Sequence, residues 1–151
     1  MDIFEKLTGA GFIDLGFAPW ESGKGLQIQN LHELHDEAPG VYVMHYEGRI
    51  HKVGKSSASL KRRLLGYSKF DRDRLAHFET GSDRSSRKQR SAIERLALPG
   101  FHVLALQADI CERNLPGLGF PVKISSFDAH DLERKVIKLV KADDHKLEFG
   151  A

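Results

Sequence analysis

Residues 39–54 read PGVYVMHYEGRIHKVG, and this segment organises the rest of the chain. Pro39-Gly40 interrupts any preceding element, and two runs rich in β-branched and aromatic residues follow, at 41–46 and 49–53. The two runs are separated by Glu47-Gly48, a connection that contains a turn residue. Strand-forming runs around such a connection predict a β-hairpin.

The loop of this hairpin decides which side chains share a face. A two-residue loop would set Tyr42 opposite Val53 and turn Lys52 to the other face. A three-residue loop over 46–48, with Gly48 in a left-handed bulge position, would set Tyr42 opposite Lys52. We predict the three-residue loop, and therefore a tyrosine and a lysine facing each other.

The chain after the hairpin alternates between helical and strand patterns. Capping residues at 56–59 precede a helix of about ten residues, in which Leu60, Leu64 and Tyr67 recur at helical spacing. A second basic helix is predicted over 84–98, ended by Pro99-Gly100.

Three further segments complete the pattern. The continuous apolar run 101–106 predicts a buried central strand. Proline, glycine and asparagine make 107–124 read as an irregular loop. The last clear element is a helix over 129–142 with Asp128 as its cap, and a core stripe of Leu132, Val136, Leu139 and Val140 runs along it. Glu133 lies at the edge of that stripe.

The predicted fold class is α/β. We expect a small sandwich with a central three-stranded, mixed or antiparallel sheet that the hairpin begins and helices flank. Residues 1–38 are interpreted as an N-terminal extension with a short helix at 2–7 and a strand at 26–29. Residues 39–151 form the main domain, with a basic helical insertion at about 69–98.

Composition narrows the class of protein. The 151 residues are 40% hydrophobic, enough for one core, and no apolar run is long enough to span a bilayer. The start of the chain lacks the order of a secretion signal, so we expect a cytoplasmic protein of bacterial or phage type. The single cysteine, Cys111, is expected to be a buried small hydrophobe. The net charge is only +2, but residues 61–95 hold eleven Lys or Arg against five acids, a pattern suited to phosphate contacts.

Several short motifs occur in an order that resembles the GIY-YIG nucleases. They are Gly40-Val41-Tyr42, Lys52-Val53-Gly54, the Leu60–Leu64 segment LKRRL and the Leu132–Ile137 segment LERKVI. Lysine in place of the second motif tyrosine resembles a subgroup of that superfamily whose motif reads K-[IV]-G. The family's late asparagine is absent, and Leu147-Glu148-Phe149 resembles the ending of the same subgroup.

The resemblance implies a catalytic set and a cofactor. It assigns the first motif tyrosine to Tyr42, the second motif position to Lys52, the catalytic arginine to Arg63, an adjacent aromatic to Tyr67 and the metal-binding glutamate to Glu133. Magnesium, with manganese as a substitute, fits a single carboxylate because this ion keeps several waters. The implied activity is hydrolysis of DNA phosphodiester bonds.

These residue types suit phosphodiester hydrolysis. A guanidinium on Arg63 can fork onto the scissile phosphate and offset its developing charge. Tyr42 is a candidate general base whose ordinary pKa near 10 is high for neutral pH. Lys52 is expected either to lower that pKa or to accept the proton itself when neutral.

The expected partner is double-stranded DNA. A homodimer is one arrangement that lets single-strand sites cut both strands. The residues predicted to contact DNA are Lys55, Ser56, Arg62, Arg84, Arg87, Lys88 and Arg90.

Other interpretations remain open at this point. The chain could be a DNA-binding module that keeps the fold without cleavage, or a protein-interaction domain whose basic segment binds an acidic partner. Several site residues also have an ordinary explanation. Tyr42 could be a common strand aromatic, Lys52 an edge-strand lysine and Arg62 and Arg63 exposed helix positions, while Glu133 could pair with Lys138 or Arg134. The eight histidines show no zinc-ligand spacing.

Overall fold

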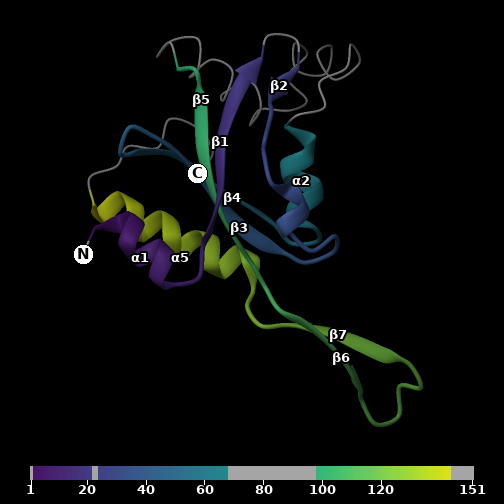
Figure 1. The fold of residues 1–151 in the computed structure, drawn as a ribbon. Helices are drawn as coiled ribbons and strands as arrows, with labels where there is room; N and C mark the ends of the chain where they lie inside the picture. The colour runs from purple at the N-terminus through teal and green to yellow at the C-terminus, as the bar shows by residue number, and fades with distance from the viewer. Residues whose placement is uncertain (1, 22–23, 68–97, 144–151) are drawn as a thin grey trace, which may run out of the picture.

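The computed structural model describes residues 2–21, 24–67 and 98–143. Within these residues a twisted sheet stands between two helical layers, and a separate hairpin projects from one end (Figure 1). Helices α1 (Ile3–Gly9) and α5 (Ala129–Ala142) lie on one side of the sheet, and helix α2 (Leu60–Gly66) on the other. No helix in the described ranges is long and apolar enough to cross a membrane.

The sheet has five strands, all antiparallel, in the order β2-β1-β5-β3-β4. The predicted α/β sandwich is confirmed, but its sheet has five strands instead of the predicted three. The strands are β1 (Ile13–Glu21), β2 (Gly25–Leu26), β3 (Gly40–Tyr46), β4 (Arg49–Ser56) and β5 (Gly100–Gln107). The predicted buried strand at 101–106 is β5, the central strand, while β4 forms one edge.

The alternation of β3 side chains separates two cores. Val41 and Val43 point to the α1/α5 face and pack with residues such as Val136 and Val140. Tyr42 and Met44 point to the α2 face and join Leu60, Leu64, Tyr67 and Phe101 in the second core. The hairpin tyrosine therefore lies on the face opposite to helix α5.

The β3–β4 turn differs from the predicted three-residue loop. Tyr46 pairs with Arg49, so the turn has two residues, and Glu47 and Gly48 have φ of 49° and 78°. Two consecutive left-handed residues suit the twist of a tight hairpin. The register then shifts by one residue at His51, because His45 pairs with Ile50 whereas Met44 pairs with Lys52 and Tyr42 with Gly54. This bulge returns Lys52 to the Tyr42 face, diagonally rather than directly opposite.

Two strand regions escaped the sequence prediction. Strand β1 contains Gly16 and Pro19, which disfavour a strand, yet its residues from Ile13 to Pro19 pair with β5 through a bulge between Asp14 and Gly16. Strands β6 (Ile110–Asn114) and β7 (Pro121–Ser125) form a hairpin in the segment predicted to be an irregular loop. Cys111 is exposed on β6, not buried as expected.

The helix boundaries follow their caps. Asp128 accepts a hydrogen bond from Asp131 N at 2.8 Å, which confirms the predicted start of α5. Ser59 caps α2, which is shorter than the ten residues expected. Helix α1 begins at a capping box between Asp2 and Glu5. The one-turn helix η1 (Leu31–Glu33) lies beside α2. Residues 84–97 of the helix predicted at 84–98 lie outside the described residues.

The α1 face contains a row of aromatic rings that bears on stability. His45 stacks on His102, with ring centroids 5.2 Å apart, and Phe4 of α1 packs on His45 at 4.7 Å. Burial and, to a smaller extent, the charge of His102 lower the pKa of His45 to about 4, although Asp14 opposes this. The folded chain therefore disfavours protonated His45.

The stability of the fold is expected to fall below pH 6.5 because of His45. The unfolded chain takes up this proton near pH 6.5 and the folded chain only near pH 4, so stability from this group is complete above pH 6.5 and declines between those values. The free energy of unfolding should fall between pH 7.5 and pH 5 in both proteins. We expect this fall to be smaller by about 1 kcal/mol in the His45→Leu variant than in the wild type, after allowance for solvent screening at a partly buried ring. Urea unfolding at both pH values measures this, and equal losses would remove His45 as the cause.

Candidate active site

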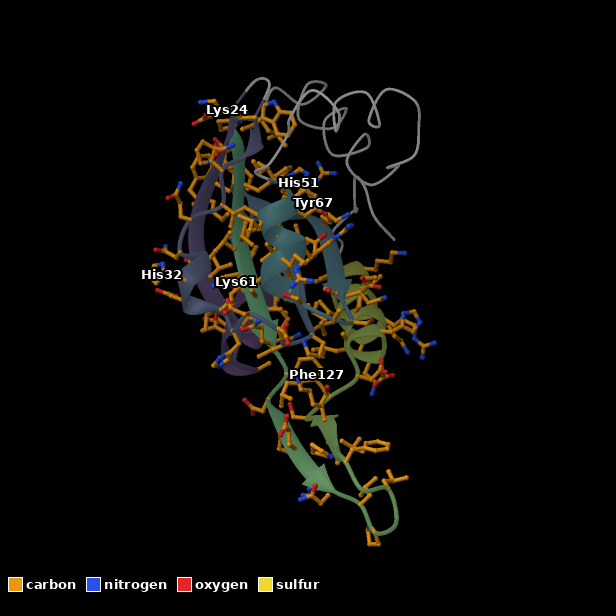
Figure 2. The ribbon with its side chains drawn as sticks, turned by 90° about the vertical axis from the view of Figure 1, so that its right-hand side faces the viewer. Lys24, His32, His51, Lys61, Tyr67 and Phe127 are labelled. Atoms are coloured by element: carbon orange, nitrogen blue, oxygen red, sulfur yellow. The ribbon has the colours of Figure 1, made fainter. Side chains whose placement is uncertain are left out.

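Tyr42 and Tyr67 form the inner part of the candidate site. Tyr42 is completely buried on β3, and Tyr67 is 3% exposed. Tyr67, which is labelled in Figure 2, directly follows α2. Their hydroxyl oxygens lie 2.5 Å apart in a hydrogen bond, and their rings meet edge to face with centroids at 5.9 Å. Helix α2 thus brings a second phenol onto the hydroxyl of the motif tyrosine.

The glycine after Lys52-Val53 is required by this packing. Gly54 pairs with Tyr42 across the hairpin, and a Cβ placed on it would collide with the Tyr42 ring and hydroxyl. The ring of Tyr42 therefore lies directly over Gly54 of β4. The motif glycine provides the space in which the catalytic candidate lies.

Two cations lie close to the tyrosine pair. The Arg63 guanidinium carbon is 5.6 Å from the centre of the Tyr67 ring, and the side chain of Arg63 is exposed. Lys52 is 3% exposed on the same sheet face as Tyr42. The candidate site thus consists of one exposed residue, Arg63, and three buried ones, Tyr67, Lys52 and Tyr42.

Glu133 comes from the other side of the sheet. It belongs to α5, which packs against β3 and the edge strand β4, and its side chain is partly buried. Its negative charge nevertheless reaches the Lys52 ammonium, where it favours the charged form. Helix α5 covers the edge strand β4, whose Lys52 side chain lies on the opposite face, so the two charges act on each other across or around this strand.

The proton affinities of Tyr42 and Lys52 move in opposite directions. Burial raises the pKa of Tyr42 well above 10, and the neighbouring Tyr67 raises it further, against the lowering effect of Arg63. Burial lowers the pKa of Lys52, with Tyr67 and Glu133 opposing and Arg63 assisting. Both shifts favour the neutral form of each group.

The expectation that Lys52 lowers the pKa of Tyr42 is not met. The cation that acts on the Tyr42 hydroxyl is Arg63, and burial outweighs it. The sequence could not reveal this, because the degree of burial of a strand tyrosine depends on a helix that packs over it. Tyr42 is better suited to holding a proton than to removing one.

The predicted DNA contacts are only partly covered by the described residues. Arg62 is exposed on α2, whereas Lys55 pairs with Val41 and so belongs to the α5 face. Ser56 Oγ accepts hydrogen bonds from the backbone of Ala58 and Ser59, which shapes the turn before α2. The remaining predicted contacts, Arg84, Arg87, Lys88 and Arg90, lie outside the described residues, as does Glu148.

A buried histidine beside the site was not assigned a role from the sequence. His51 is the bulged residue of β4, is 3% exposed and packs its ring on Phe101 at 5.4 Å (labelled in Figure 2). Alternation from the two-residue turn puts His51 on the α2 face, and the bulge at this residue keeps Lys52 on the same face. The predicted three-residue loop, with Tyr42 opposite Lys52, would have turned His51 to the other face.

The donor set at the sheet edge limits which metal fits. Within the described ranges no three His, Cys, Asp or Glu side chains come together, which is unlike a zinc cage. Glu133 offers one partly buried carboxylate. Magnesium is commonly held by one or two carboxylates with waters and substrate phosphate, so a single glutamate fits this ion.

Gly54→Ala tests the packing of the tyrosine pair. The added methyl collides with Tyr42, and overpacking of this kind should cost about 2 kcal/mol in thermal or urea unfolding. Gly9→Ala is the matched control, because nothing lies within 4 Å of a Cβ there, and it should leave stability unchanged or slightly raised. Equal stabilities of the two variants would contradict the placement of the Tyr42 ring.

Comparison with known proteins finds a solved structure with a similar fold. No protein-family model matches this chain, and no curated protein matches it. Among solved structures, the restriction endonuclease HPY188I in complex with product DNA superposes with a TM-score of 0.54 and 20% sequence identity. The match covers 97% of this chain and 83% of that one. At this identity the similarity establishes a shared fold.

Proposed function

We propose that this chain is a magnesium-dependent endonuclease of the GIY-YIG type that hydrolyses phosphodiester bonds in double-stranded DNA. One observation carries the proposal: Tyr42, Tyr67, Lys52 and Arg63 cluster on one sheet face, and the negative charge of Glu133 on α5 favours the protonated form of Lys52. The fold shared with a restriction endonuclease supports it.

Arg63 is the residue that first meets the substrate. Arg63 is an exposed residue while its neighbours in the cluster are buried, so it is the member of the cluster that a DNA phosphate can approach first. A guanidinium can donate two parallel hydrogen bonds to non-bridging oxygens and balance the charge that grows on them. The aromatic face of Tyr67 below holds the guanidinium in place.

Lys52 is the better proton acceptor of the two candidates. Its pKa is lowered by burial, whereas that of Tyr42 is raised, so Lys52 is nearer to its basic form at neutral pH. Tyr42 and Tyr67, joined through their hydroxyls, then orient the attacking water and retain their protons. Glu133 would hold the magnesium ion, which supplies charge stabilisation to the phosphate when bound.

The direct test is plasmid nicking. Supercoiled DNA incubated with the full chain and magnesium should be converted to the nicked or linear form, and chelation of the metal should stop this. Glu133→Ala, prepared and purified in parallel, excludes a contaminating nuclease. Absence of nicking by the wild type at every magnesium or manganese concentration would rule out the endonuclease.

A DNA-binding module without cleavage is the second candidate. The complete burial of Tyr42 favours it, because a shielded hydroxyl has no access to water in this conformation. Binding that persists without nicking would establish it. A titration across salt also separates both DNA functions from a protein-interaction domain, since phosphate contacts make DNA affinity fall steeply as salt rises.

A further inference from the structure

The β6–β7 hairpin projects away from both core layers (Figures 1 and 2). Neither of its strands belongs to the five-stranded sheet, and an isolated two-stranded hairpin is marginally stable in water. Its apolar side chains are nonetheless exposed. Of the six exposed large apolar residues in the described ranges, all but Ile13 belong to it: Ile110, Leu115, Leu118, Phe120 and Ile124.

The two faces of the hairpin differ. Lys123 lies on the hairpin face that is turned toward Glu37. Its ammonium nitrogen is 3.6 Å from a carboxylate oxygen of Glu37. The register pairs Cys111 with Ile124 and Arg113 with Val122, so these four residues share the opposite face. We call this the outer hairpin face. It is apolar at its centre, where Cys111 and Ile124 are exposed and Val122 is partly exposed.

The charge of the hairpin argues against DNA as its partner. Residues 108–126 contain two acids and two bases, and the tip 114–121 contains no charged residue. Phosphate binding depends on basic residues, so this projection offers no net attraction to a nucleic acid. An exposed apolar surface of this kind is typical of a protein–protein contact.

The outer hairpin face is complementary to itself. The pairing continues one step beyond the strands, because Asp109 O accepts a hydrogen bond from Ser126 N at 2.9 Å and Ser126 Oγ accepts one from Asp109 N at 2.9 Å. Strand alternation then sets Asp109 on the same face as Arg113, about 13 Å away, with Cys111 midway. Two copies packed antiparallel about a twofold axis at Cys111 would bring each Asp109 against the partner's Arg113.

We propose that the outer hairpin face binds the same face of a second copy of this chain, forming a twofold dimer. The apolar centre and the tip residues lose their exposure, and each end of the face gains an ion pair. The proposal does not depend on nuclease activity, because it rests on the hairpin alone. If the chain cuts DNA, such a dimer also supplies two sites.

Charge reversal tests the geometry. Sedimentation of the full chain over a range of concentrations should give a dimer, and Arg113→Glu should raise its dissociation constant at least about tenfold by opposing Asp109 of the partner. The double variant Asp109→Arg with Arg113→Glu exchanges the two charges, so both ion pairs of the dimer can form again with reversed polarity. Its dissociation constant should return to within about threefold of the wild-type value. A double variant that stays as weak as the single one would overturn the proposed pairing.

The only cysteine of the chain reports on the contact. A short bis-maleimide should join Cys111 of two copies into a covalent dimer, and Cys111→Ser should prevent it. Phe120→Ser should weaken dimerisation, whereas Ile13→Ser, an exposed apolar residue outside the hairpin, should not. Circular dichroism confirms that each variant folds. A wild type that remains monomeric, or a Phe120→Ser variant that loses only DNA affinity, would overturn the proposal.

Discussion

Replacing Glu133 by glutamine should lower the rate of magnesium-dependent cleavage by about 10³-fold or more, while DNA binding persists. Glutamine has nearly the same shape and retains one oxygen, but it lacks the negative charge that a magnesium ion needs from its single protein ligand. The same change removes the charge that supports protonated Lys52, so the pKa of Lys52 should fall further.

A matched control lies two residues earlier on the same helix. Asp131 is an exposed carboxylate whose oxygens lie 2.9 Å from Lys135 and 3.9 Å from Arg134. Asp131→Asn removes an equal charge from α5 and should leave the cleavage rate within about twofold. Nicking at saturating DNA measures turnover, and fluorescence anisotropy measures binding. Wild-type turnover by Glu133→Gln would exclude this glutamate as the metal ligand.

Local sequence signals account for the elements that were predicted correctly. Short stretches of sequence predict the hairpin at 40–56 and the capped helix α5. The signals are two strand-forming runs around a turn for the hairpin and an Asp cap for the helix. The central strand β5 is likewise a continuous apolar run. Each of these elements forms where propensity and tertiary packing agree.

Elements decided by tertiary pairing were missed. Strand β1 carries a glycine and a proline, and its nine residues form a strand because β5 pairs with its first part and β2 with its last two residues. The register of the β3–β4 hairpin depends on a bulge at His51, which no local pattern marks. The sequence therefore predicted the correct face for Lys52 by an incorrect turn.

The candidate site shows the same division. Motif spacing selected five residues, and four of them lie together around the Tyr42 hydroxyl. Their burial was not predictable from spacing, because it depends on how closely α2 covers the sheet. For this reason the direction of the Tyr42 pKa shift could be learned only from the structure.

Replacing Arg63 by lysine should lower turnover by about 10²- to 10³-fold although the positive charge remains. Arg63 lies 5.6 Å over the Tyr67 ring, where a planar guanidinium can stack and still present two donors to a phosphate. An ammonium is a point charge that cannot make that paired contact. The loss should appear in the turnover rate more than in DNA affinity, because the contact strengthens as charge develops on the phosphate.

Arg62→Lys is the control that isolates geometry from charge. Arg62 is the preceding residue of α2 and is also exposed, but no stacking on Tyr67 holds it. As a contact that positions the DNA backbone, it should change affinity by about threefold or less and leave turnover at saturating DNA unchanged. Equal losses of turnover in the two variants would mean that α2 contributes only general positive charge. In that case Arg63 would be a DNA-binding residue, and the charge balance at the cleaved bond would have to come from elsewhere in the cluster.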